Sequence, residues 1–175
     1  MLTEVFECAC VGFCFSGSEA LHADRLNDYD GIRAIVPLKT KREKKAGAWH
    51  EFDMRIMPGY IFIYALDFDA LKAAASRCAV RLLTYDGEQH SLYGSDLEFA
   101  RYLWTHDGVI GVSLAASEGD RLIVLEGPLK GNEAIIRRID KRHMLVQVEF
   151  KICALKTWLS FDWVDKYENR KAAGK

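Results

Sequence analysis

Over the first 110 or so residues, segments in which apolar residues have the spacing of a strand alternate with segments in which they have the spacing of a helix. Period-two or continuous apolar runs predict strands at 6–15, 32–37 and 60–64, with a weaker one across 80–92. Apolar residues at helical spacing predict a helix that ends near Leu26 and others at 66–78 and 95–104, the last opened by the capping box Ser95-Asp96-Leu97-Glu98. This interleaving predicts an α/β sandwich with helices packed on a sheet.

The pattern changes after Gly119, where only short strand-like runs remain, separated by Gly-Pro and charged turns. Such spacing predicts a small five-stranded SH3-like β-barrel, so that the whole chain is of the α+β class. The predicted strands are 121–125, 134–139, 144–150 and 156–161. The expected organisation is a first domain at 1–112, a linker at 113–118, a barrel at 119–167 and a basic tail at 168–175.

Composition narrows the class of protein. Of the 175 residues, 50% are hydrophobic and 28% are charged, which is typical of a globular protein with a real core. The net charge of -1 provides no overall attraction to nucleic acid, so any such binding needs a local patch. The longest apolar stretch, 5–15, is interrupted by Glu7 and is too short to span a membrane, and we expect a cytoplasmic protein.

The residues that usually carry chemistry form no recognisable site. The five cysteines include no C-x-x-C pair, which favours buried thiols over zinc binding, with a redox sensor at Cys8 and Cys10 as the alternative. The five histidines are scattered without ligand spacing. The sequence has no Gly-rich phosphate loop, nucleophile elbow or metal triad, so we expect a protein that is not an enzyme and has no metal or cofactor.

Two segments resemble one protein family. Residues 118–134, with turns at Gly127-Pro128 and Gly131, resemble a KOW motif, the signature of NusG C-terminal domains. Met57-Pro58-Gly59-Tyr60-Ile61-Phe62-Ile63 resembles a strand of the NusG N-terminal (NGN) domain, at the right distance before the KOW motif. Together they cover about 5–166 and imply an NGN domain followed by a KOW barrel, and a factor that acts on transcription elongation.

Two departures from the family pattern imply a specialised paralog of the RfaH or LoaP kind. The first strand ends in Phe13-Cys14-Phe15-Ser16-Gly17 and lacks the usual Trp-Tyr beginning. Ile152-Cys153-Ala154-Leu155 stands where housekeeping NusG has the Ile-Phe-Gly-Arg loop that binds Rho or the ribosome. Without that aromatic anchor, Rho or ribosome binding is not expected. A housekeeping NusG or a ribosome-associated KOW protein stays an alternative.

The resemblance implies docking of the first domain on the β′ clamp helices of RNA polymerase. The residues that match the family surface are Phe13, Tyr60, Phe62 and Tyr85. The alternative is that these aromatics only fill the core. The basic run 39–45 has the position of a hairpin loop, where cations could contact upstream DNA phosphates. The DNA candidates are Lys41, Arg42, Lys44 and Lys45, and the alternative is a solubilising loop.

Positive charge also concentrates in the barrel, where it suits RNA binding. The candidates are Lys130, Arg137, Arg138, Lys141, Arg142, His143, Lys151 and Lys156. By resemblance to the LoaP group, they would bind a nascent RNA hairpin and so direct processive antitermination by a monomeric factor. The alternative is a charged surface that meets a protein.

Overall fold

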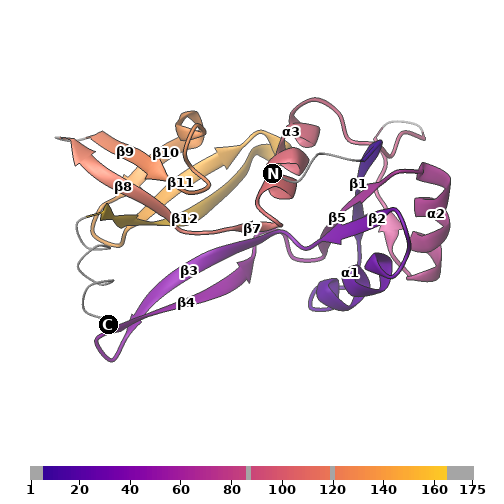
Figure 1. The fold of residues 1–175 in the computed structure, drawn as a ribbon, viewed down its shortest axis with the longest axis horizontal. Coiled ribbons are helices and arrows are strands. Elements are labelled where there is room, and N and C mark those ends of the chain that lie inside the picture. Colours follow the sequence, from indigo (N-terminus) through magenta and orange to yellow (C-terminus); the bar gives the residue numbers. More distant parts are fainter. Residues whose placement is uncertain (1–5, 86–87, 119–120, 165–175) are drawn as a thin grey trace. The chain divides into compact units, whose positions relative to one another are not determined.

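The computed structural model describes residues 6–85, 88–118 and 121–164 (Figure 1). It is a mixed α/β structure with three α-helices in the described part of the chain. Internal packing divides the chain into two units, one of residues 1–38 and 55–108, the other of residues 39–54 and 109–175. The second unit therefore takes a segment from inside the predicted first domain.

The first unit is built on a four-stranded antiparallel sheet. Its strands are β1 (Cys8–Phe13), β2 (Ile32–Ile35), β5 (Tyr60–Ala65) and β6 (Arg81–Leu82), in the order β2-β5-β1-β6. Three of the four predicted strands are confirmed with small shifts of their ends. The weak strand expected across 80–92 shortens to the two residues of β6.

Helices cover both faces of this sheet, as Figure 1 shows. Helices α1 (Glu19–Asn27) and α2 (Phe68–Arg77) pack on the face that carries Ile61 and Ile63. Helix α3 (Gly94–Thr105) packs on the other face through Phe99 and Trp104. The predicted sandwich is confirmed for this unit, with the sheet as its middle layer.

The start of α3 differs from the prediction. Its N-cap is Tyr93, with extended backbone and no side-chain cap hydrogen bond, so Ser95 lies inside the helix and does not open a capping box. Asp96 in the first turn accepts a hydrogen bond from the Tyr85 hydroxyl at 2.6 Å. The loop before the helix therefore contacts its first turn through a side chain, a tertiary contact that the local pattern could not show.

The second unit contains the four strands that its pattern predicts and a fifth strand, β8 (Ser113–Glu118), that was not predicted. They are β8 (Ser113–Glu118), β9 (Arg121–Glu126), β10 (Ile136–Asp140), β11 (Leu145–Phe150) and β12 (Leu155–Trp163), in the order β10-β11-β12-β8-β9. Neighbours pair antiparallel except β12 and β8, which are parallel. Short 3-10 turns lie at Glu133–Ile135 and Ile152–Ala154.

The predicted linker at 113–118 is wrong. These residues form β8, which pairs with both β9 and β12, and Ser113 and Ala115 are fully buried. Alanine is uncommon in strands, so Ala115 and Ala116 gave no strand signal, and the pairing of β8 with two neighbouring strands overrides that preference. The predicted tail at 168–175 lies outside the described residues.

The second unit also holds a β-hairpin from early in the sequence. Strands β3 (Leu38–Lys45) and β4 (Ala48–Arg55) form a three-stranded sheet with β7 (Val109–Ile110), in the order β4-β3-β7. The basic run predicted as a loop is thus a strand. The turn is Ala46-Gly47, whose φ angles of 49° and 86° are those of a tight two-residue hairpin turn.

Candidate functional site

An aromatic pair lies at the end of the first sheet, on the face that carries α3. Phe13 and Tyr60 are register partners on β1 and β5, with ring centroids 5.5 Å apart and an interplanar angle of 64°. Arg81 on β6 pairs with Phe13 from the other side, and its guanidinium lies 6.0 Å from the Phe13 ring centroid. We call Tyr60, Phe13 and Arg81 the aromatic row. Phe13 is 42% exposed, so the row is a surface.

Phe62 does not belong to this surface, in contrast to the prediction. It points to the same face two residues further along β5, but it is fully buried, and its ring packs edge-on against Phe99 of α3 at 5.5 Å. Tyr64 is buried in the same way and donates a hydrogen bond to the Ala100 carbonyl at 2.6 Å. Helix α3 thus covers the rows of Phe62 and Tyr64, and a side chain that it covers cannot contact a partner.

Other aromatics surround α3 and the aromatic row. Phe15, in the loop after β1, is 87% exposed, and Tyr93, at the start of α3, is 55% exposed. Tyr85 is half-buried against Tyr93 with ring centroids 4.5 Å apart. Burial raises the pKa of the Tyr85 hydroxyl, and its hydrogen bond to Asp96 raises it further. Phe15 lies only two residues after Phe13 but was not among the residues predicted for this surface.

A fully buried carboxylate holds the loops next to the aromatic row. Glu19 accepts hydrogen bonds from the Gly59 amide at 2.7 Å and the Gly17 amide at 2.8 Å, and its Oε2 lies 2.9 Å from the Arg55 Nε. Burial opposes the charge, but the hydrogen bonds from the Gly59 and Gly17 amides and the Arg55 guanidinium hold the pKa of Glu19 below its usual value. Glu19 therefore fixes the turn before Tyr60 and the loop after Phe13.

Gly59 completes this arrangement, and a side chain at its position would be strained. Its φ is +86°, and an added Cβ would lie 3.1 Å from both the Cys14 carbonyl oxygen and the Phe13 ring. Its amide faces Glu19 while its carbonyl accepts from the Cys14 amide at 2.9 Å. The Pro-Gly-Tyr motif thus places the β5 backbone against Phe13.

The cations of the hairpin have different surroundings. Lys41 and Lys45 both pair with Glu43, at 2.6 and 3.6 Å, and Lys44 is exposed. Arg42 is 7% exposed, and its Nη1 lies 2.9 Å from the carboxylate of Asp162, itself 3% exposed. The Arg42 Nε lies 3.0 Å from Glu51, and Trp49 packs on the guanidinium at 5.1 Å. Arg42 is therefore not available to DNA, which corrects its assignment.

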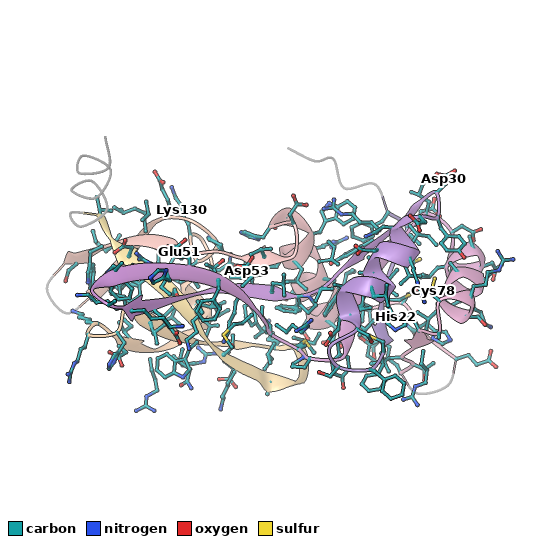
Figure 2. All side chains as sticks on the ribbon, turned by 90° about the horizontal axis from the view of Figure 1, so that it is seen from below. His22, Asp30, Glu51, Asp53, Cys78 and Lys130 are labelled. Atoms are coloured by element: carbon teal, nitrogen blue, oxygen red, sulfur yellow. The ribbon has the colours of Figure 1, made fainter. Side chains whose placement is uncertain are left out.

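A cleft of about 850 Å³ lies beside this buried arginine, within the second unit. Its lining includes the carboxylates of Glu51, Glu126 and Asp162 and the guanidinium of Arg42. Figure 2 labels Glu51 on the hairpin. The acids exceed the cations around this cleft, which disfavours a phosphate there, and no local sequence pattern predicts the cleft.

The structure divides the eight predicted RNA-binding residues into groups. Arg137, Arg138 and Lys156 lie on one exposed face of the β10-β11-β12 sheet, where Glu149 pairs with Arg137 at 3.1 Å and with Lys156 at 3.9 Å. The turn after β10 holds the exposed Lys141, Arg142 and His143, the last of which bonds to Asp140 through its amide and Nδ1. Lys130 lies in the turn after β9 (Figure 2), and Lys151 follows β11.

Cys8, Cys10 and His22 have surroundings that favour a structural role. Burial raises the pKa of Cys10 to about 12 and also raises that of Cys8, which disfavours thiolates at the proposed redox pair. His22 lies beside Cys78 (Figure 2), with its Nδ1 2.8 Å from the Cys78 carbonyl oxygen. No group of His, Cys, Asp and Glu suited to a metal occurs in the described residues.

A search of the described helices finds none that is long and apolar enough to cross a membrane.

Comparison with known proteins finds a similar solved structure but no matching family model or curated protein. No protein-family model matches the sequence, and the comparison with curated proteins found no match. A solved structure described as "Domain interaction in Thermotoga maritima NusG" is similar, with a TM-score of 0.49 and 15% identity, over 87% of this chain and 91% of that chain. At that similarity the case for a function rests on the surfaces above and on the two sequence motifs.

Proposed function

We propose that this chain is a specialised NusG-type transcription elongation factor that acts in processive antitermination. The first unit would dock on RNA polymerase, and the second unit would bind nascent RNA. The observation that carries the proposal is the aromatic row, which stays on the surface at the start of the Pro-Gly-Tyr strand while α3 covers the rest of that sheet face. The role is one of binding, with no chemical step.

The aromatic row suits a helical partner. Tyrosine and arginine are among the side chains that most often dominate binding energy at interfaces, and Phe13 adds a second aromatic ring to the row. Phe13 and Tyr60 stand edge to face and offer an apolar surface, on which a helix could lay its own apolar residues. By the motif resemblance, the partner that we propose is the pair of β′ clamp helices of the polymerase.

Docking would change transcription only by favouring one polymerase state. A factor that binds elongating polymerase more tightly than paused polymerase shifts the equilibrium by its differential affinity. Cations at the hairpin tip could add contacts with upstream DNA phosphates, and Lys44 is the best placed because it is exposed. Lys41 and Lys45 would have to share Glu43 with such a phosphate.

The second unit supports RNA as the signal that recruits the factor. Three cations share one exposed sheet face, and three more basic residues project at the neighbouring turn. Ile152, at the position of the family's Rho- and ribosome-binding loop, is buried, and residues 152–155 include no aromatic residue. A housekeeping factor that links polymerase to the ribosome is therefore the weaker alternative.

The first test is binding of the full chain to purified core RNA polymerase. Phe13→Ala combined with Tyr60→Ala should weaken binding by at least about 30-fold, since hot-spot side chains contribute about 2 kcal/mol or more. Leu21→Ala on α1 is the matched control, because Leu21 is 52% exposed and lies on the opposite layer. Equal affinity of the double variant and the control would refute docking through this row.

A further inference from the structure

A second surface row crosses the sheet of the second unit. Arg138 on β10 is the register partner of Gln147 on β11, which in turn is the partner of Trp158 on β12. Antiparallel partners project to the same face with Cβ atoms about 5 Å apart. We call Arg138, Gln147 and Trp158 the stacking row. The inward residues beside them, Val146, Val148 and Leu159, are buried.

The stacking row is accessible and places a large aromatic among polar groups. Trp158 is 37% exposed, Arg138 is exposed and Gln147 is half-buried. Arg138 forms no ion pair with any residue that the structure describes, whereas the cations of the next row, Arg137 and Lys156, share Glu149. The indole and the Arg138 guanidinium are therefore both accessible to a ligand on this face.

We propose that this face binds unpaired nucleotides, with a base stacked on Trp158. The Arg138 guanidinium would bind a backbone phosphate, and the Gln147 amide would hydrogen-bond a base edge. Base stacking on aromatic side chains between basic groups is how proteins bind single-stranded nucleic acid. The face carries three cations, Arg137, Arg138 and Lys156, against two acids, Glu149 and Asp140, the second of which is bonded to His143, and the excess of cations complements a phosphate backbone.

The inference rests on the proposed function only for the identity of the strand, which would be nascent RNA. The mode of binding follows from the face itself. A paired A-form stem exposes no base face to a tryptophan, so the site selects a loop or single-stranded segment rather than a stem. Paired segments of the same RNA could still contact the basic turn at Lys141, Arg142 and His143.

The test measures affinity of the full chain for three fluorescein-labelled probes: a 12-nucleotide RNA without secondary structure, the DNA of the same sequence, and the blunt RNA duplex. Trp158→Ala should lower affinity for the single strands by about 10-fold or more, and Trp158→Phe should retain most of it. Leu125→Ala on β9, 38% exposed and separated from β12 by β8, is the matched control. Similar affinity for RNA and DNA single strands would show that the 2′-hydroxyl is not read.

Two further measurements keep the test valid if Trp158→Ala folds poorly. Arg138→Gln should weaken binding. It should also reduce the slope of log affinity against log salt concentration by about 1, the change expected when one phosphate contact is lost. In 5-fluorotryptophan-labelled protein, the fluorine signal that disappears in Trp158→Phe should shift when the RNA single strand is added. Tighter binding of the duplex than of either single strand, or an unmoved Trp158 signal, would overturn the proposal.

Failure here and failure of the proposed function are distinguishable. Trp158→Ala should bind core RNA polymerase as well as the unsubstituted chain, because Trp158 and the aromatic row lie in different units. If Trp158→Ala loses RNA while the Phe13 and Tyr60 variants keep polymerase, the stacking site stands and polymerase docking falls. The opposite pair of results would remove the stacking site and leave the docking surface.

Discussion

The aromatic row and the stacking row share one geometry, three side chains presented on one face by neighbouring strands, yet they lie in opposite surroundings. In the first unit, α3 covers the same sheet face, and Tyr60 and Phe13 form its uncovered end. In the second unit, the stacking row projects among polar and charged side chains, and Trp158 is its one aromatic.

This difference indicates how each row selects a partner. A continuous apolar face that ends in open aromatics offers area to another protein, whose own apolar residues extend the core. A single aromatic between cations offers one stacking position and charge, which suits a base and its phosphate. The neighbours of an aromatic residue, more than the residue itself, indicate what it binds.

The largest effect should come from substituting the covered member of the first sheet face. Phe62→Ala should lower the free energy of unfolding by about 3 to 5 kcal/mol, because it empties a fully buried position beneath Phe99. Phe13→Ala should cost about 1 kcal/mol or less, since Phe13 is 42% exposed. Urea denaturation of both variants measures the two losses in the free energy of unfolding. Equal losses would show that α3 does not separate the two rows.

A slightly smaller effect should come from the buried pair that ties the hairpin to the second sheet. Asp162→Ala should cost about 3 kcal/mol, because it leaves Arg42 buried with Glu51 as its remaining carboxylate. Hydrogen exchange followed by mass spectrometry should show faster exchange in β3 and β12 and unchanged exchange in β1 and β5. Lys44→Ala, at an exposed position of the same hairpin, is the control. Uniform acceleration in both units would contradict this account.

The smallest effect should come from Glu19, which supports the aromatic row from behind. Glu19→Gln keeps the shape but turns an amide donor toward the backbone donors of Gly59 or Gly17, which should cost about 1 to 3 kcal/mol at pH 7. Because the folded-state pKa of Glu19 lies below its usual 4.5, the carboxylate stabilises the fold above that pH and loses this effect as the pH falls through the folded-state value.

The stability gap between the unsubstituted chain and Glu19→Gln should therefore narrow on acidification below about pH 4.5. Urea midpoints of both proteins from pH 7 to pH 3 make the comparison. Glu43 and Asp140 also have lowered pKa values, but they are present in both proteins and cancel in the difference. A gap that stays constant with pH would show that the Glu19 charge does not hold these loops.

Local patterns in the sequence predict most of the secondary structure and part of the first site. Alternation along 60–64 gives the strand, and the Pro-Gly-Tyr motif identifies Tyr60 as a candidate. The pattern places Tyr60, Phe62 and Tyr64 on one face but does not show where α3 begins to cover it. The exposure of Tyr60 and Phe13, and the burial of Phe62, depend on that tertiary contact.

Long-range partners explain the remaining errors. From the sequence, Arg42 has the pattern of a solvated loop cation. Its partner Asp162 lies on β12, far along the chain, so no residue near Arg42 in the sequence indicates the buried ion pair. For Trp158, by contrast, the local sequence pattern does indicate an exposed position. It shares strand parity with Lys156, which predicts an outward position, whereas Leu159 and Phe161 alternate inward.

The position of β12 has a consequence for the order in which this protein can fold during synthesis. Although β12 is the last strand of the described chain, it lies in the middle of its sheet, between β11 and β8, and it carries Asp162. At a translation rate of about 5 to 20 residues per second, the hairpin waits on the order of 10 s for that strand. Until β12 emerges from the ribosome, β8 and β11 have unpaired edges and Arg42 has no Asp162. A chaperone that shields strand edges should therefore act on this protein late in translation.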